Sequence, residues 1–281
     1  MDHKSLSWNI RGLGQCNKIV AIRNAILKNN PTICTIQESK REIVDDSLIQ
    51  SLWGSNRCNY VYLASVGAFG GIIVIWKDGI LVMEDHLLEA FYVSVKFHNV
   101  VDDFVWVFTS VYGASYDVYY NQFWQELRDV RVYYDEPWLL GGDFNAILAD
   151  DERNVPGGAV ANRKSFKALI NRLSLIDLTM AGGRFTWTNS QQPLILIRLD
   201  RFLLCPNFQV HCPALLQMRL RRPISDHTPI LLCCNSNENL RAPFRLYNFI
   251  LNHPDFLNNL KIWWMNLNFS GKPSYIFAKK L

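Results

Sequence analysis

Six short apolar runs in this chain lie beside polar side chains of the kind that bind ions and activate water, and this repetition constrains the fold most. The residues at these runs are Asn9, Glu38, Tyr112, Asp143 with Asn145, Asp200, and Asp226 with His227. A single polar residue after a strand is usually a turn residue. Six such placements favour a rigid sheet that presents catalytic groups at its strand ends.

The expected strands outnumber the expected helices. Apolar and β-branched runs predict strands at 4–10, 32–37, 60–63, 71–76, 91–97, 104–112, 138–142, 184–188, 194–202 and 230–234. Helical spacing of apolar residues predicts helices at 18–27, 119–130 and 163–173. Many strands with few helices predict an α+β fold, a four-layer α/β/β/α sandwich of two packed mixed sheets flanked by helices.

A change of composition near Asn235 predicts a domain edge. The segment NSNENLRAP is polar and ends in proline. We expect residues 1–235 to form one domain and residues 236–281 a C-terminal linker and helical tail. Within the tail, residues 255–267 (DFLNNLKIWWMNL) have the spacing of an amphipathic helix that exposes Trp263 and Trp264.

Composition constrains the cellular compartment of the protein more than it constrains the binding partner. The net charge of +4 allows a local basic groove but does not by itself require nucleic acid. The N-terminus lacks the apolar core of a signal peptide, and no run approaches the roughly 20 apolar residues of a membrane span. The seven cysteines contain no C-x-x-C pair, which argues against a disulfide framework or a zinc site. We expect an intracellular protein, with the nucleus among the compartments allowed.

The polar residues suit phosphodiester hydrolysis, which needs a cation, an activated water and donors to the phosphate oxygens. Glu38 offers the hard oxygen ligand that Mg²⁺ prefers. Asp143 can orient the attacking water, and Asp200 can fix the tautomer of His227. The remaining polar groups that can hold the phosphate are Asn9, Tyr112, Asn145 and His227 itself.

Six ordered motifs carry a family resemblance: SWNIRGLG, TIQES, VYGA, LLGGDFNAIL, RLDRFL and PISDHTPILL. Over residues 4–234 the chain resembles the endonuclease/exonuclease/phosphatase superfamily. More narrowly, it is similar to the apurinic-type endonuclease domain of plant LINE-type (non-LTR) retrotransposons. The tail resembles the segment that joins that domain to a reverse transcriptase, a domain that does not follow here.

The resemblance implies a role for each matched position. Glu38 becomes the metal ligand for Mg²⁺, or alternatively Mn²⁺, and Asp226 lies beside the metal. Asp143 becomes the water-orienting base, and Asp200 pairs with His227. The phosphate neighbours are Asn9, Asn145 and Tyr112, while Ser225 completes the SDH turn and Thr186 matches a polar position near DNA. Arg11 departs from repair members, some of which carry a second carboxylate there, and this favours a retrotransposon-type nuclease.

The substrate is less constrained than the chemistry. Arginines and lysines flank the motifs, Arg153 among them, and such cations suit a DNA backbone. The exception is Arg201, for which the RLDRFL motif of the resemblance implies a structural ion pair. We therefore expect a Mg²⁺-dependent DNA-nicking endonuclease that acts on DNA as a monomer and has no membrane partner. Two alternatives stay open: a catalytically silent retrotransposon relic that only binds nucleic acid, and a phosphatase of the same superfamily. A Gly-rich turn is a further reading of the GGDFN motif.

Overall fold

Two sheets and their covering helices form the larger unit of the computed structural model. The structure describes residues 3–67, 69–157, 159–234, 255–267 and 269–270. These residues fall into two units, residues 3–234 and residues 255–270. The domain edge that we expected near Asn235 lies outside the described residues, so it stays a prediction.

The first sheet has seven strands in the order β10-β14-β15-β1-β2-β4-β3. Its strands are β1 (Lys4–Asn9), β2 (Ile33–Gln37), β3 (Cys58–Val66), β4 (Phe69–Lys77), β10 (Met180–Ala181), β14 (Leu215–Arg219) and β15 (Ile230–Cys234). The central strands β1 and β2 are parallel, whereas β15 and β4 join them antiparallel.

The second sheet has six strands in the order β5-β6-β7-β8-β13-β9. Its strands are β5 (Leu81–Glu89), β6 (Tyr92–Asn99), β7 (Val105–Tyr112), β8 (Trp138–Asp143), β9 (Ile176–Asp177) and β13 (Asp200–Leu204). A short ribbon of β11 (Trp187–Thr188) and β12 (Leu196–Ile197) stands apart from both sheets.

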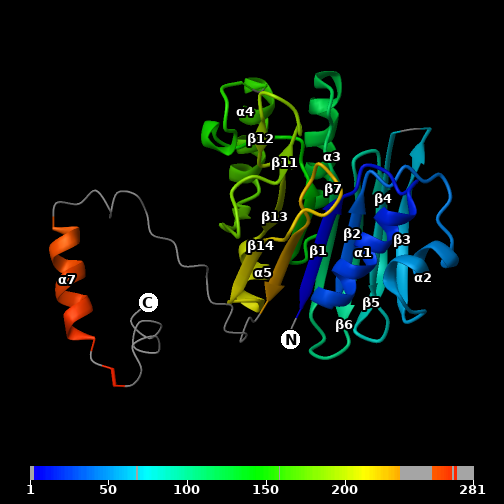
Figure 1. The fold of residues 1–281 in the computed structure, drawn as a ribbon. Helices are drawn as coiled ribbons and strands as arrows, with labels where there is room; N and C mark the ends of the chain where they lie inside the picture. Colours follow the sequence, from blue (N-terminus) through cyan, green and yellow to red (C-terminus); the bar gives the residue numbers. More distant parts are fainter. Residues whose placement is uncertain (1–2, 68, 158, 235–254, 268, 271–281) are drawn as a thin grey trace. The chain divides into compact units, whose positions relative to one another are not determined.

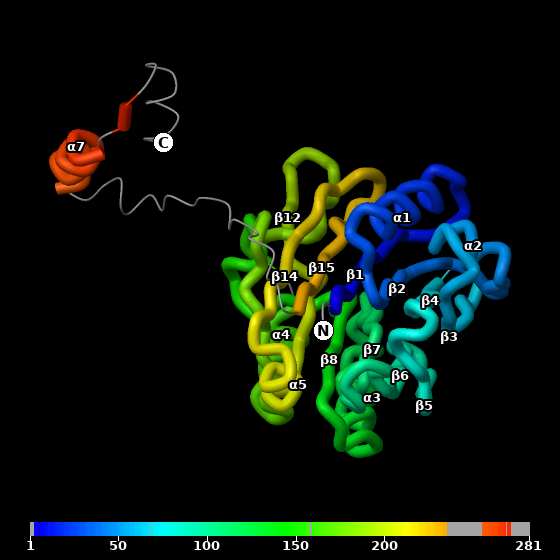
Figure 2. Tube along the Cα trace, turned by 90° about the horizontal axis from the view of Figure 1, so that it is seen from below, coloured from blue at the N-terminus to red at the C-terminus, as the bar shows by residue number. Residues whose placement is uncertain are grey.

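Helices cover the outer face of each sheet (Figures 1 and 2). They are α1 (Cys16–Asn29) and α2 (Asp46–Trp53) on the first sheet, and α3 (Tyr120–Tyr133), α4 (Val160–Arg172) and α5 (Pro206–His211) on the second, with 3-10 turns η1 (Asp117–Tyr119) and η2 (Asp150–Glu152). The expected four-layer sandwich is therefore confirmed.

Alternation along β4 shows how the layers are held together. Ile73 and Ile75 pack with Ile22 of α1, whereas Ile72 and Val74 pack with Phe108 of the facing sheet. Because successive strand residues point to opposite faces, an apolar run of this length fills two cores at once. The strand predicted at 71–76 therefore separates the core under the helices of the first sheet from the core between the two sheets.

Several elements differ from the expectation. The strand predicted at 194–202 is two strands, because Arg198 between them turns its side chain into ion pairs with Glu152 and Asp177. The strand predicted at 184–188 narrows to β11. Helix α2 was missed, although Asp45 caps it by accepting from the Leu48 amide at 2.8 Å and Gly54 ends it at φ +90°.

The smaller unit contains helix α7 (Phe256–Asn266), as the apolar spacing predicted. Trp263 is exposed in it as expected, but Trp264 is partly buried, so that part of the expectation is wrong. In the larger unit Cys34, Cys233 and Cys234 are buried and all seven cysteines are free thiols. None of the helices in the described part of the chain has the length and apolar character that crossing a membrane requires.

Candidate active site

Three predicted site residues stand side by side at the end of the second sheet. Asp143, the last residue of β8, pairs in register with Tyr112 of parallel β7 and with Asp200 of antiparallel β13. A Cβ on Gly142 would lie 2.0 Å from the Val111 carbonyl oxygen, and Gly142 has φ +150°. The two glycines of GGDFN are therefore strand residues that permit close strand approach. The reading of this motif as a Gly-rich turn is wrong.

Asn9 links the first sheet to this strand end. It is the last residue of β1, and its Nδ2 donates to Asp143 Oδ2 at 2.9 Å. On the other carboxylate oxygen of Asp143, the Asn145 amide donates at 2.9 Å. Both oxygens of Asp143 are thereby held in a fixed direction by groups from two segments.

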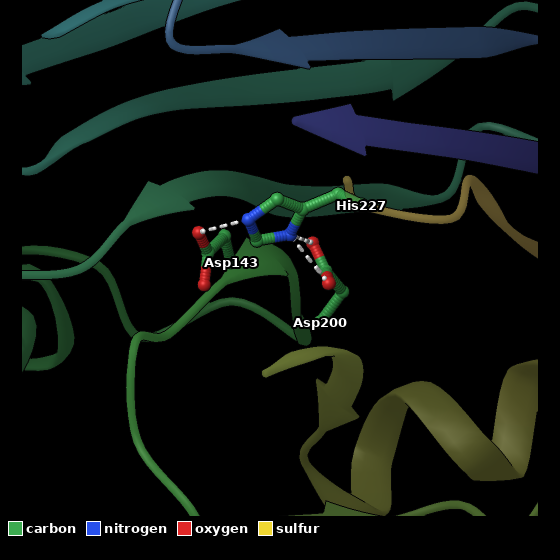
Figure 3. Close-up of side chains that lie close together, drawn as sticks. All are labelled: Asp143, Asp200 and His227. Carbon is green, nitrogen blue, oxygen red and sulfur yellow. Dashed lines mark hydrogen bonds and ion pairs between the residues drawn. The ribbon is translucent and has the colours of Figure 1, made fainter. Parts of the chain in front are cut away.

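His227 lies between two carboxylates (Figure 3). Its Nδ1 is 2.9 Å from Asp200 Oδ2, and its Nε2 is 3.6 Å from Asp143 Oδ2. Burial lowers the pKa of His227, but the charges of Asp200 and Asp143 outweigh it and raise this pKa to about 9. The imidazole is therefore a protonated donor at neutral pH.

The pKa of Asp143 is also raised, but here burial is the main cause. Burial raises its pKa to about 6 against the lowering charge of His227, while Asp200 raises it further. A carboxylate with a pKa near neutrality is suited to accept a proton from water. The pair thus consists of a base and an acid whose carboxyl and imidazole groups face each other.

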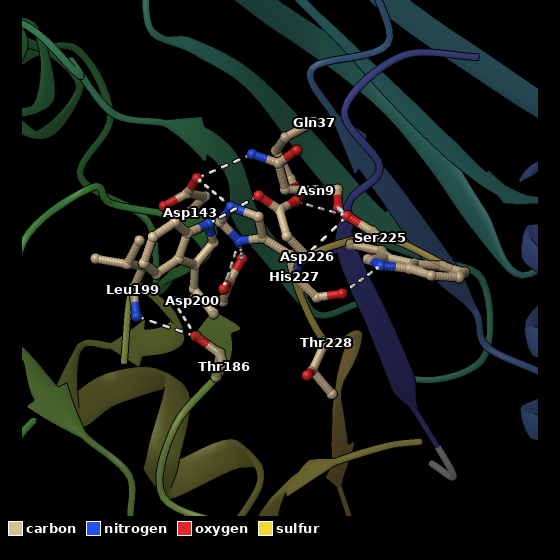
Figure 4. Close-up of polar contacts among 12 residues, drawn as sticks. Asn9, Gln37, Asp143, Thr186, Leu199, Asp200, Ser225, Asp226, His227 and Thr228 are labelled. Carbon is tan, nitrogen blue, oxygen red and sulfur yellow. Dashed lines mark hydrogen bonds and ion pairs between the residues drawn. The ribbon is translucent and has the colours of Figure 1, made fainter. Parts of the chain in front are cut away.

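Thr186 and Ser225 hold the backbone of the segments that carry Asp200, His227 and Asn9 (Figure 4). The Thr186 hydroxyl accepts from the amides of Leu199 and Asp200, each at 3.0 Å. The Ser225 hydroxyl donates to the Asn9 carbonyl at 2.9 Å and accepts from the His227 amide at 3.1 Å. Both side chains are buried. We therefore propose positioning roles for them in place of the expected substrate contact.

The site opens into a pocket of about 440 Å³. Its lining residues are Asn9, Arg11, Glu38, Lys40, Phe69, Tyr112, Ser115, Tyr116, Asp143, Asn145, Trp187, Ile197, Leu199 and His227. Six predicted site residues thus meet at one pocket, and Asp200 reaches it through His227. Burial, with the nearby charges of Glu38 and Asp143, raises the pKa of the Tyr112 phenol, which therefore stays a hydrogen-bond donor.

Glu38 and Asp226 form a second acidic pair, and cations already stand against it. Arg11 Nη1 lies 2.5 Å from Asp226 Oδ2, and its Nε lies 3.9 Å from Glu38 Oε2. Lys40 Nζ lies 3.3 Å from Glu38 Oε1. Two hard carboxylates that attract positive charge at a pocket wall fit a divalent ion such as Mg²⁺.

A second group of side chains has possible metal-ligand atoms close together, but its chemistry suits a metal ion less well. Ligand atoms of Asp143, Asp200 and His227 lie within 4.8 Å of one another. A histidine ligand must be neutral, however, whereas His227 is protonated and its Nδ1 is engaged by Asp200. We therefore propose that this group handles protons and that Glu38 and Asp226 are the candidate metal ligands.

The expected basic contacts are mostly used within the protein. Arg153 lines a neighbouring cavity that shares Asn145 with the site pocket, so it does not lie in the pocket itself. Arg163 and Arg184 form ion pairs with Asp150 and Asp151. Arg198 and Arg201 form buried pairs with Glu152 and Asp177, which confirms the structural ion pair expected of Arg201.

Among the pocket residues that sequence reasoning missed, Lys40 and Trp187 contact the acidic pair. Lys40 follows Glu38 by two residues, and this spacing beside an expected metal ligand was the available signal. Trp187 donates from Nε1 to Asp226 Oδ2 at 2.9 Å. Its place in the FTW motif favoured simple packing, so nothing in the sequence distinguished it from a core residue.

Comparison with known proteins agrees with this architecture. The model of the endonuclease/exonuclease/phosphatase family matches residues 6–227. None of the curated proteins compared matches the sequence.

Solved structures share the fold at low sequence identity. The AP endonuclease LMAP from Leishmania major is 14% identical, with 83% of this chain and 87% of that chain covered at a TM-score of 0.68. The endonuclease domain of TRAS1, a telomere-specific non-LTR retrotransposon, is 14% identical, with 84% and 100% covered at 0.61. The mannosyl-6-phosphatase Bt3783 from Bacteroides thetaiotaomicron is 13% identical, with 82% and 98% covered at 0.58.

Proposed function

This chain belongs to the endonuclease/exonuclease/phosphatase family, and from that premise we propose that it is a Mg²⁺-dependent phosphodiester hydrolase that nicks DNA. The observation that carries the proposal is the facing pair of Asp143 and His227, whose pKa values of about 6 and about 9 leave a base and an acid at one pocket. Such a divergent pair is the arrangement that acid–base hydrolysis requires.

Each side chain has a step that its geometry supports. Asp143, oriented by Asn9 and Asn145, accepts a proton from the attacking water. His227, kept protonated by Asp200, donates a hydrogen bond to a phosphate oxygen, and Tyr112 offers its hydroxyl from the same wall. Glu38 and Asp226 would hold a divalent ion, which would neutralise charge at the phosphate.

DNA as the substrate rests on similarity. The ordered motifs resemble the endonuclease domain of plant LINE-type elements, and the folds of an AP endonuclease and of a retrotransposon endonuclease domain are similar. We further propose that the protein acts as a monomer, that Mn²⁺ can replace Mg²⁺, and that it acts in the nucleus. We also propose that residues 236–281 correspond to the segment that joins such a domain to a reverse transcriptase in those elements.

Nicking of supercoiled plasmid tests the proposal. Purified protein with Mg²⁺ should convert supercoiled plasmid to the open circle, and chelator should stop the conversion. Asp143→Ala and His227→Ala should abolish it, whereas Arg57→Met, at an exposed arginine that lines a different pocket, should not.

The alternatives predict other outcomes. Wild-type protein that retains DNA in a salt-sensitive way without nicking would indicate a silent relic. The similar fold of a mannosyl-6-phosphatase makes phosphomonoester hydrolysis the second alternative. Release of phosphate from a sugar phosphate, with no nicking, would favour that activity.

A further inference from the structure

The loop that carries Arg11 and the loop that carries Glu38 and Lys40 are joined by backbone hydrogen bonds beside the pocket. The Gly12 amide donates to the Glu38 carbonyl at 2.6 Å, and the Leu13 amide donates to the Ser39 carbonyl at 2.9 Å. Arg11, Glu38 and Lys40 all have left-handed φ, at 50°, 54° and 53°. Residues with a Cβ adopt this conformation rarely, and it persists where the surroundings impose it. The backbone thus brings two cations against the two carboxylates.

The carboxylates are largely buried, whereas the arginine side chain that pairs with them is exposed. Trp187 Nε1 donates to Asp226 Oδ2 at 2.9 Å, and the Ser225 hydroxyl oxygen lies 3.3 Å from Asp226 Oδ1. The side chains of Glu38 and Asp226 are only 12% and 17% exposed, but that of Arg11 is 52% exposed. A long, exposed guanidinium therefore covers a largely buried acidic pair from the side of the pocket.

We propose that Arg11 is a tethered counter-cation that neutralises Glu38 and Asp226 until a divalent ion binds them, and that is then displaced to bind a substrate phosphate. The metal part rests on the carboxylate geometry, and the phosphate part rests on the proposed function. A divalent ion between these carboxylates repels a guanidinium a few ångströms away, since like charges at such distances repel even near a protein surface. The flexible side chain relieves this repulsion by turning into the pocket, where a phosphate offers a bidentate partner.

Displacement makes Arg11 a competitor of the metal. Removing its charge should therefore tighten divalent binding, by roughly tenfold for one nearby unit charge. Arg11→Met keeps an unbranched side chain, so the left-handed backbone is no more strained than before. Arg11→Lys keeps the charge and should stay near the wild-type affinity.

Titration calorimetry with Mn²⁺, on the full chain without nucleic acid, measures this directly. Arg11→Met should bind Mn²⁺ about tenfold more tightly than the wild type, with Arg11→Lys and the control Arg57→Met unchanged. Thermal unfolding in chelator checks that each variant is folded. Unchanged Mn²⁺ affinity in folded Arg11→Met overturns the inference, and so does the absence of Mn²⁺ binding in every variant.

Binding of a short DNA duplex in Ca²⁺ tests whether the displaced Arg11 guanidinium binds a substrate phosphate. Arg11→Met should lose roughly tenfold in affinity, because one phosphate contact is removed. An unchanged affinity overturns the phosphate part of the inference. Nicking without the Mn²⁺ effect would contradict only this inference, whereas the Mn²⁺ effect without nicking would contradict only the proposed function.

Discussion

Two neighbouring residues of β13, Asp200 and Arg201, belong to two different buried charged clusters. The clusters differ in whether their positive and negative groups balance. Arg201 is fully buried, and its guanidinium lies 2.8 Å from Glu152 and 2.9 Å from Asp177, with Arg198 as the second cation. Two positive and two negative groups cancel there. Asp200 faces His227 and, beyond it, Asp143, so two carboxylates share one imidazolium at the wall of an open pocket.

Burial raises the pKa of the carboxyl groups in both clusters, but the net shifts go in opposite directions. At Glu152 burial raises the pKa, but the charge and hydrogen bonds of Arg201 outweigh it and the pKa falls below its usual range. At Asp143 burial dominates and raises the pKa to about 6. The fold therefore favours ionised Glu152 and disfavours ionised Asp143. The cluster around Arg201 stabilises the fold. The cluster around His227 keeps Asp143 as a base with a pKa near neutrality, at a cost in stability.

The largest expected effect is the loss of activity in Asp143→Asn. The amide cannot accept a proton from water, so the nicking rate should fall by about 10²–10⁴-fold. Because the fold disfavours the ionised carboxyl, its removal should leave the melting temperature near that of the wild type. A variant that keeps nicking would remove Asp143 from the chemistry.

Arg201→Met should break the other cluster. It leaves Glu152 and Asp177 buried with Arg198 as their only arginine partner, and this should cost about 3–5 kcal/mol in the free energy of unfolding. Denaturant unfolding measures the loss, with exposed Arg57→Met as the matched control. A loss under about 1 kcal/mol would show that the cluster does not hold the framework together.

Thr186→Val tests which of the two clusters Thr186 supports. Its hydroxyl accepts from the amides of Leu199 and Asp200, which stand next to both clusters in the chain. Two buried amides lose their acceptor, which should cost about 1–3 kcal/mol in stability. The nicking rate should also fall, by roughly tenfold, as Asp200 loses its position. Intact activity with reduced stability would assign Thr186 to the framework alone.

The pH profile of nicking should be bell-shaped. Below about pH 6 protonation removes the Asp143 base, and above about pH 9 His227 loses the proton that it donates. The folded pKa of His227 is raised, so its stabilising contribution is complete below its unfolded value and lost as the pH rises through about 9. Initial rates between these limits, compared with those of His227→Gln, check whether the alkaline limb belongs to this residue.

The strand ends were predictable because each apolar run stops at a polar residue. That pattern placed Asn9, Tyr112 and Asp143 correctly at strand ends, and the many strands with few helices predicted two packed sheets. The convergence of these side chains was not predictable from spacing, since it depends on the pairing of β8 with β7 and β13. The RLDRFL motif implied a structural ion pair for Arg201, but its partners Glu152 and Asp177 could not be identified, because they lie far along the chain.

The nicking rate per folded molecule, compared between Asp143→Asn and Arg201→Met, tests the central claim most directly. Both variants are assayed with Mg²⁺ on supercoiled plasmid, at a temperature below their melting points. We predict that folded Arg201→Met nicks at the wild-type rate, whereas folded Asp143→Asn loses nicking by at least about 100-fold. Equal losses in both variants, or retained nicking in Asp143→Asn, would contradict the account.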